Sequence, residues 1–384
     1  MTSFTRRALM GAVFAVGLAA GPALADQPTI KIGVSISTTG QGAALGIPEK
    51  NTLEVVAREI GGAKLELILL DDGGDPTAAT TNARRLVGED KVDILIGSSV
   101  TPASLAVAGV ALETTVPHFA LSPLPLQPGR DTWTFVMPPP VPLMAKGVFE
   151  HMKAKGIKTV GIIGFSDSWG DLWVKEFKAS AEPMGLSMVA DERYARADTS
   201  VAGQVLKLVA ARPDAVLVGA SGTAAALPVI GLRERGYTGP IYQTHGAVTR
   251  DFIRIAGKAA EGVIFTSGPV VAAASQDDAS PTKAPGVAYT TAYEAKFGPG
   301  TITQFGAHMY DVFEVLKRVA PIALKSAQPG TQAFREALRV ALEAEKNIPA
   351  SQAVYSYAAG NHYGVDDRAR ILITVKDGGW AIVK

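Results

Sequence analysis

The stretch DILIGSSVTP, residues 93–102, contains the unit from which the chain is built. The mostly apolar run 93–96 predicts a strand, because short apolar runs are typical of the inner strands of a sheet. The turn 97–100 follows, and Thr101 ahead of Pro102 predicts a helix that begins there with Thr101 as its N-cap. A strand, a turn and a helix in this order are typical of α/β proteins.

The same order recurs along most of the chain. Helical patterns with one apolar face, such as residues 200–211, separate short apolar runs. Alternating strands and helices predict parallel sheets covered by helices. The expected strands are residues 30–35, 65–70, 93–96, 118–121, 159–164, 186–190, 215–219, 240–242 and 263–266.

A proline-rich stretch interrupts this rhythm. Six prolines between residues 122 and 142 exclude a long helix there, and we expect the chain to cross to a second lobe at the end of this stretch. A length of 384 residues agrees with more than one domain. Residues 272–285 then form the return path. Helices near 289–297, 304–324 and 331–344 and a hairpin across residues 377–378 complete the chain.

Composition excludes several classes of function. Lys and Arg total 37 against 36 Asp and Glu, so no overall positive field would attract nucleic acid. The chain has no cysteine, which excludes disulfides, Cys-ligated zinc and iron–sulfur clusters. Its five histidines show no metal-ligand spacing. We therefore expect no metal and no cofactor.

The first 25 residues have the pattern of a signal peptide. Arg6 and Arg7 precede the apolar stretch 11–20, and Ala23-Leu24-Ala25 fits signal peptidase cleavage after Ala25. The apolar stretch is too short for a membrane helix, and no cysteine follows it to carry a lipid. We expect a protein free in a periplasm-like space without a stable membrane anchor. The paired arginines leave both the Sec and the twin-arginine export routes open.

The start of the helix near Thr101 is a candidate anion site. Free backbone N–H groups and the positive end of the helix dipole favour an anion there, and the hydroxyl groups of Ser98, Ser99 and Thr101 would add donors. The alternative is an ordinary capped helix. The acidic stretch at residues 71–75 lacks the spacing of a calcium loop. Asp75 ahead of Pro76 is explained better as a helix N-cap.

Three further loops follow expected strands. Residues 219–223 have the position of a nucleotide-binding turn but lack the complete glycine fingerprint. Trp169 at a loop tip suits a wall against which a ligand stacks. His245 is either a surface or capping residue or, in a crevice, a donor to a carboxylate that titrates near neutral pH. The common hydrolase motifs are missing, which favours a protein that is not an enzyme.

Several short motifs occur in a characteristic order along the chain. They are Ile32-Gly33-Val34-Ser35, Thr39-Gly40, Gly61-Gly62, Asp71-Asp72 with Asp75-Pro76, Gly97 with Thr101-Pro102, Leu121-Ser122-Pro123, Ala259-Ala260-Glu261-Gly262-Val263 and Tyr310-Asp311. Taken in order, these motifs resemble the leucine/isoleucine/valine-binding type of periplasmic solute-binding protein. This resemblance implies two doubly wound parallel α/β lobes joined by three hinge crossovers, a type I fold that closes on a small molecule. It also implies delivery of that ligand to the permease subunits of an ABC importer, and we expect a monomer.

The resemblance also implies boundaries and site residues. One lobe would comprise residues 26–142 with 271–352, and the other 143–270 with 353–384. Thr101 and nearby amides would hold a ligand carboxylate, Leu45 would line the wall, and Trp169 would face it from the second lobe. In such folds ligands bind at the carboxyl ends of strands. The expected binding residues are Leu45, Ser98, Ser99, Thr101, Ser122, Leu124, Trp169, Ser221 and His245.

Departures from the family pattern bear on the ligand. His245 stands where amino-acid binders usually have an acid for the ligand ammonium, and Ser221 where they often have an aromatic residue. Leu124 replaces a small residue expected after Pro123. An unpaired buried ammonium costs several kcal/mol, so the sequence predicts an aromatic acid or a 2-oxo acid as ligand. The alternatives are a branched-chain amino acid receptor and a nucleotide-dependent enzyme that uses residues 219–223.

Overall fold

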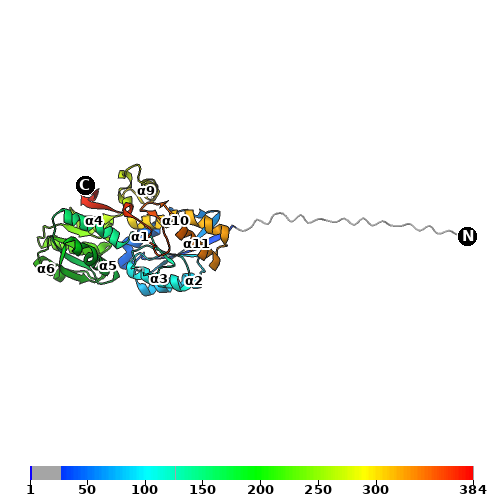
Figure 1. Ribbon diagram of the computed structural model, residues 1–384, viewed down its shortest axis with the longest axis horizontal. Helices are drawn as coiled ribbons and strands as arrows, with labels where there is room; N and C mark the ends of the chain where they lie inside the picture. Colours follow the sequence, from blue (N-terminus) through cyan, green and yellow to red (C-terminus); the bar gives the residue numbers. More distant parts are fainter. Residues whose placement is uncertain (2–26, 126, 384) are drawn as a thin grey trace.

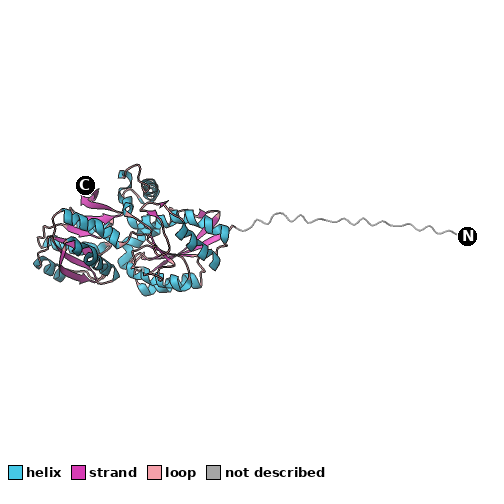
Figure 2. Cartoon of the chain, in the orientation of Figure 1, coloured by secondary structure: helices cyan, strands magenta, loops and turns pink. Residues whose placement is uncertain are grey.

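The computed structural model describes Met1 and residues 27–125 and 127–383. Apart from Met1, the expected signal peptide lies outside the described residues. The chain forms two lobes, each with strands between layers of helices, and α9 (Lys283–Phe297) projects near their junction (Figures 1 and 2). Among the described residues, no helix has the length and apolar character needed to cross a membrane.

The first lobe contains a six-stranded sheet in the order β2-β3-β1-β4-β5-β6. Its strands run parallel except for β2, which pairs antiparallel with β3. One face of the sheet packs on α10 and α11, and the other on α2 and α3. The elements are β1 (Thr29–Ile36), α1 (Ala43–Thr52), β2 (Glu59–Ile60), β3 (Ala63–Asp71), α2 (Pro76–Gly88), β4 (Ile94–Gly97), α3 (Thr101–Thr114), β5 (His118–Ala120), β6 (Thr134–Val136), α10 (Gln304–Ser326) and α11 (Gln332–Ala344).

The second lobe contains a seven-stranded sheet in the order β15-β14-β11-β10-β9-β7-β8. Its first five strands along the chain are parallel, and the C-terminal hairpin β14–β15 adds two antiparallel strands at one edge. The elements are α4 (Val141–Ala154), β7 (Thr159–Phe165), α5 (Ser168–Glu176), β8 (Ser187–Tyr194), α6 (Ala202–Ala210), β9 (Ala215–Gly219), α7 (Ala226–Glu234), β10 (Ile241–Gln243), α8 (Arg250–Ala256), β11 (Ile264–Ser267), β14 (Ile371–Lys376) and β15 (Gly379–Ile382).

These two sheets confirm the predicted fold class. Each of the nine expected strands is present, with ends shifted by at most four residues. The hairpin turn at Asp377-Gly378 is also present, and both residues have the positive φ that such a turn requires. The sequence analysis missed β6, because this short strand lies within the proline-rich stretch.

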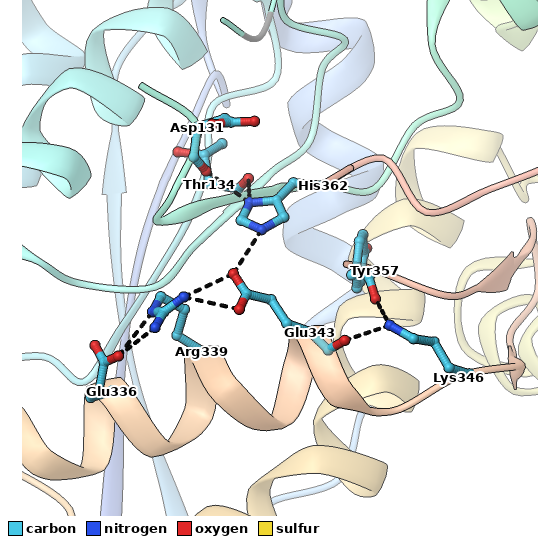
Figure 3. Close-up of polar contacts among 8 residues, drawn as sticks. All are labelled: Asp131, Thr134, Glu336, Arg339, Glu343, Lys346, Tyr357 and His362. Atoms are coloured by element: carbon cyan, nitrogen blue, oxygen red, sulfur yellow. Dashed lines mark hydrogen bonds and ion pairs between the residues drawn. The ribbon is translucent and has the colours of Figure 1, made fainter. Parts of the chain in front are cut away.

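Glu343 of α11 and Lys346 just after this helix bind the following segment to the first lobe (Figure 3). The Glu343 carboxylate lies 3.1 Å from Nε2 of His362, and Nδ1 of His362 lies 2.8 Å from the carbonyl oxygen of Asp131. The Lys346 ammonium donates to the carbonyl oxygen of Tyr357. Residues 357–362 are therefore tied both to α11 and to the loop ahead of β6.

Packing gives a basis for dividing the chain into lobes. Tyr355, Tyr357 and Ala369 belong to the core of the first lobe, whereas Ile373 belongs to that of the second. We therefore propose lobes of residues 27–140 with 268–369 and 141–267 with 370–383, so that the last crossing lies near residue 370 instead of 352.

Candidate ligand-binding site

A small cavity lies between the lobes, where loops follow the carboxyl ends of strands in both sheets. Seven of the nine residues that the sequence predicts for the site line this cavity: Leu45, Ser99, Thr101 and Ser122 from the first lobe and Trp169, Ser221 and His245 from the second. The structure thus brings them together, and their role in binding stays a prediction. The remaining lining residues are Val100, Leu121, Pro123, Pro138, Phe305 and His308 from the first lobe and Arg196 and Gly246 from the second.

Ser98 and Leu124 do not line the cavity. Ser98 is fully buried elsewhere in the first lobe. Leu124 packs against Ala120 and Val136, and its backbone N–H donates to the hydroxyl of Tyr363 at 2.8 Å. This hydrogen bond fixes the loop after β5 so that the Leu124 side chain enters a small core of the first lobe.

The start of α3 forms one wall of the cavity. Its N-cap is Val100, and the Thr101 hydroxyl donates to the carbonyl oxygen of Pro123 at 3.0 Å. The prediction that Thr101 is the N-cap is therefore wrong, because its hydroxyl binds the loop after β5 and does not cap the helix. The predicted cap at Asp75 is confirmed, since its carboxylate accepts from the N–H of Ala78. The first-turn N–H groups of α3 lack intrahelical acceptors, so they can hold an anion at this wall.

Trp169 lines the cavity from the second lobe. Asp167 caps α5 by accepting from the N–H of Trp169 at 2.9 Å, which places this residue in the first turn of the helix. Its indole N–H donates to the carbonyl oxygen of Ala220 at 3.1 Å. The Trp169 ring meets the His245 ring edge to face at 5.1 Å. The indole is thus oriented by its hydrogen bond and presents an aromatic surface to the cavity.

Two histidines, His245 from the second lobe and His308 from the first, line the cavity. Burial lowers the pKa of each to about 3, so both imidazoles are uncharged at neutral pH. The expectation that His245 titrates near neutral pH is wrong, because burial removes the solvation of the imidazolium. Neither ring nitrogen of His245, nor Nδ1 of His308, has a hydrogen-bond partner among the described residues. A bound ligand with polar groups would supply such partners.

Arg196 is a site residue that the sequence analysis missed. Its Nε atom lies 2.5 Å from the Asp167 carboxylate, and its Nη1 donates to the Ser221 hydroxyl at 2.9 Å. The guanidinium also lies over the Phe165 ring, 4.2 Å from the ring centre. The predicted strand 186–190 ends too early to place Arg196 at a carboxyl end. Extending it through Tyr194, where β8 ends, would have brought Arg196 to the site.

The charges of the site favour an anion. None of the described residues that line the cavity is Asp or Glu, and Arg196 is a permanent cation among them. Asp167 lies behind Arg196 as its ion-pair partner. The described residues contain no group of three or more His, Asp or Glu side chains placed to hold a metal ion.

Comparisons with known proteins agree with this fold. The family described as periplasmic binding protein matches residues 29–364. An extracellular ligand-binding receptor from Rhodopseudomonas palustris is 62% identical, with a TM-score of 0.92 over 93% of this chain and 100% of that one. The Leu/Ile/Val-binding protein BraC3 of Rhizobium johnstonii is 26% identical over 348 residues, which cover 85% of this chain and 87% of the relative. A solute-binding protein from R. palustris in complex with benzoate is 19% identical over 92% of this chain and 95% of that one, and its TM-score of 0.77 shows a shared fold.

Proposed function

The chain belongs to the periplasmic binding protein family, and from this premise we propose that it captures a small carboxylate with an apolar or aromatic body, such as an aromatic acid or a 2-oxo acid. Members of this family deliver small molecules to the permeases of ABC transporters and are in general not enzymes. The family that the sequence resembles is thereby confirmed. We further propose that the chain is exported with cleavage after Ala25 and acts as a monomer in the periplasm.

The observation that carries this proposal is the lack of an acidic side chain among the described residues that line the cavity. A buried ammonium group without a carboxylate partner loses several kcal/mol of solvation free energy. A carboxylate, by contrast, would meet the N–H groups of α3 and the positive charge of Arg196. The site therefore suits an acid without an α-ammonium group.

The apolar part of the wall supports an aromatic or branched ligand body. Trp169, Phe305 and Leu45 line the cavity and are almost fully buried. Flat aromatic ligands stack well on such side chains. The R. palustris complex indicates that a fold of this kind accommodates benzoate in another protein.

A branched-chain amino acid is the second candidate ligand, because one relative is named a Leu/Ile/Val-binding protein. Its ammonium would have to compete with Arg196 for the Asp167 carboxylate. A nucleotide is disfavoured by the turn at residues 219–223. A Cβ atom added at Gly222 would lie 3.2 Å from the Leu45 side chain of the other lobe. Protein atoms therefore occupy the space beside this turn that a pyrophosphate would need.

A thermal-shift screen tests the proposal. The panel holds benzoate, 3-phenylpropionate and 4-methyl-2-oxopentanoate, with leucine, phenylalanine and NADH as competitors from the other classes. We expect an increase in melting temperature with at least one acid that lacks an ammonium, because ligand binding to the folded state stabilises it. A shift with leucine or NADH and none with these acids would contradict the proposal.

A further inference from the structure

Glu49 on α1 lies directly behind the cavity wall, and its side chain is fully buried. Its Oε2 atom lies 2.5 Å from the hydroxyl oxygen of Ser99, which lines the cavity. Its Oε1 atom has no hydrogen-bond partner among the described residues. The protonation state of this carboxyl group decides what the Ser99 hydroxyl offers to a ligand.

Two arrangements of hydrogen atoms are possible around Ser99. Its Oγ atom accepts a hydrogen bond from the backbone N–H of Ser37 at 3.0 Å. If Glu49 is ionised, the hydroxyl proton of Ser99 points to Oε2, and Ser99 has no proton left for a ligand. If Glu49 is protonated, its own proton points to Ser99 Oγ, and the hydroxyl proton of Ser99 is free to point into the cavity.

The surroundings favour the protonated form of Glu49. No cation within the described part of the chain forms an ion pair with it, and an ionised Glu49 would hold a single hydrogen bond in a site away from water. Asp72 lies nearby, where its carboxylate accepts from the hydroxyl groups of Ser35 and Ser37. Burial and then the negative charge of Asp72 raise the pKa of Glu49 well above its usual range.

We propose that Glu49 is a neutral carboxylic acid and a positioning residue, which donates its proton to Ser99 so that Ser99 donates its own to the ligand carboxylate. This inference rests on the proposed function, since it needs an anionic ligand at the start of α3. The sequence analysis treated Ser99 as a donor without a reason for the direction of its hydrogen bond. Glu49 supplies that reason.

The arrangement makes binding depend on pH. Ionisation of Glu49 would turn the Ser99 proton away from the ligand and place a negative charge behind the ligand carboxylate. A bound anion therefore raises the proton affinity of Glu49, and affinity for the anion falls as pH rises above the pKa of Glu49 in the free protein. The fall is about tenfold per pH unit until the pKa of the liganded protein is reached.

Other titratable groups near Glu49 do not produce the same effect. Asp72 lies on the loop after β3, and His308 lies on α10, which packs against α1. His308 is neutral above its pKa of about 3. Asp311, also on α10, has a pKa of about 7, but it contacts the segment after α11 and is present in every variant compared by calorimetry below. A difference in the pH dependence of affinity between the wild type and a Glu49 variant therefore reports the ionisation of Glu49.

Glu49→Gln is the decisive variant, because its amide donates to Ser99 Oγ as the protonated acid does but does not titrate. We expect calorimetry over a series of pH values to give an affinity for 3-phenylpropionate that falls in the wild type once the pH exceeds the pKa of Glu49, and that stays flat in Glu49→Gln. Ser99→Ala, the control that removes the donor, should weaken binding about tenfold at pH 6. Parallel pH profiles of wild type and Glu49→Gln would overturn the positioning role.

Infrared spectroscopy of the protein without ligand separates this inference from the proposed function. At pH 7 the wild type should show the C=O band of a protonated carboxylic acid that Glu49→Gln lacks and Asp311→Asn retains. Absence of that band would overturn the inference whatever the ligand. The band together with no binding of benzoate, 3-phenylpropionate or 4-methyl-2-oxopentanoate would overturn both the donor role of Ser99 and the proposed function.

Discussion

Arg196 is the residue that most directly links charge to ligand choice. Its ion pair with Asp167 holds the guanidinium at the cavity, since Asp167 is itself fixed as the N-cap of α5. Only part of its hydrogen-bonding capacity is used, because Nε and Nη1 have partners and the fork has five N–H donors in all. The remaining donors are available to a ligand oxygen.

Replacing Arg196 should therefore weaken binding. We expect Arg196→Met to lower the affinity for 3-phenylpropionate about tenfold or more, since a hydrogen bond to a charged group contributes about 1.5 to 3 kcal/mol. The matched control is Arg193→Met on β8, three residues earlier, whose guanidinium pairs with Asp191 and Asp171 outside the cavity. Calorimetry on both variants checks this. Equal affinities of the two variants for 3-phenylpropionate would show that Arg196 does not contribute to binding.

Thr101 has a structural role that differs from the predicted one. The Thr101 hydroxyl donates to the carbonyl oxygen of Pro123. Thr101→Val should therefore lower the free energy of unfolding by about 1 to 3 kcal/mol, the cost of leaving this buried carbonyl oxygen unpaired. The affinity for a carboxylate should change by less than about threefold, which is under 1 kcal/mol. Urea unfolding and calorimetry measure the two effects. Thr114→Val, at the far end of α3, is the control; a tenfold loss of affinity in Thr101→Val alone would contradict this assignment.

Most of the site residues could be predicted because they follow strands in an alternating pattern. Ser99, Ser122, Ser221 and His245 each lie within a few residues of a strand end, and parallel strands bring such positions to one edge. Glu49 and His308 lie inside helices, and no local pattern shows that His308 lines the cavity or that Glu49 lies behind Ser99. The direction of the Thr101 hydroxyl depends on a loop distant in sequence, so no sequence rule would give it.

At the scale of elements, Asp311 on α10 fixes the segment that leads back toward the second lobe. Its carboxylate accepts from the N–H and hydroxyl of Ser351, the N–H of Gln352 and the hydroxyl of Tyr355. Burial raises its pKa to about 7, which outweighs the lowering effect of these four donors. A single buried carboxyl group thus holds the end of one hinge segment.

This pKa predicts a pH dependence of stability. Between pH 4 and 7 the folded state retains a proton on Asp311 that the unfolded state, with its pKa near 3.8, has lost. The contribution of Asp311 to stability is therefore present below about pH 4 and is lost as pH rises to about 7. The free energy of unfolding of wild type minus that of Asp311→Asn, from urea titrations, should decrease over this range. A constant or rising difference would show that Asp311 is ionised throughout.

The elements were easier to predict than the path between the lobes. Apolar runs identified the inner strands, because burial on both faces requires continuous apolar sequence. The last crossing was harder, because residues 353–369 hold their place through Tyr355, Tyr357 and the His362–Glu343 contact, which join segments far apart in sequence (Figure 3). Such contacts leave no periodic pattern.

At the scale of the whole molecule, the cavity is closed between the lobes. Trp169 and His245 of the second lobe are almost fully buried, and the amide of Gln304 on α10 donates to the carbonyl oxygen of His245 across the cleft. A ligand cannot enter such a site unless the lobes separate. The crossovers near 141, 268 and 370 are the places where the chain would bend.

Solution scattering should detect this opening. We expect a larger radius of gyration for the free protein than for the protein saturated with 3-phenylpropionate, because hinge closure brings the two lobes together. Gln304→Ala removes the hydrogen bond to His245 that closure forms. The difference in radius of gyration between the free and the liganded protein should therefore be smaller in this variant. An identical radius with and without a bound ligand would rule out hinge motion.

The most direct test of the central claim compares acids that differ by a single group. Phenylalanine and 3-phenylpropionate share the same carboxylate and aromatic body, and only phenylalanine carries an α-ammonium. Calorimetry at pH 7 should give binding of 3-phenylpropionate at least about a hundredfold tighter, because a buried unpaired ammonium costs several kcal/mol. Leucine and 4-methyl-2-oxopentanoate form a second pair with the same expectation. Tighter binding of the amino acid in both pairs would contradict the account.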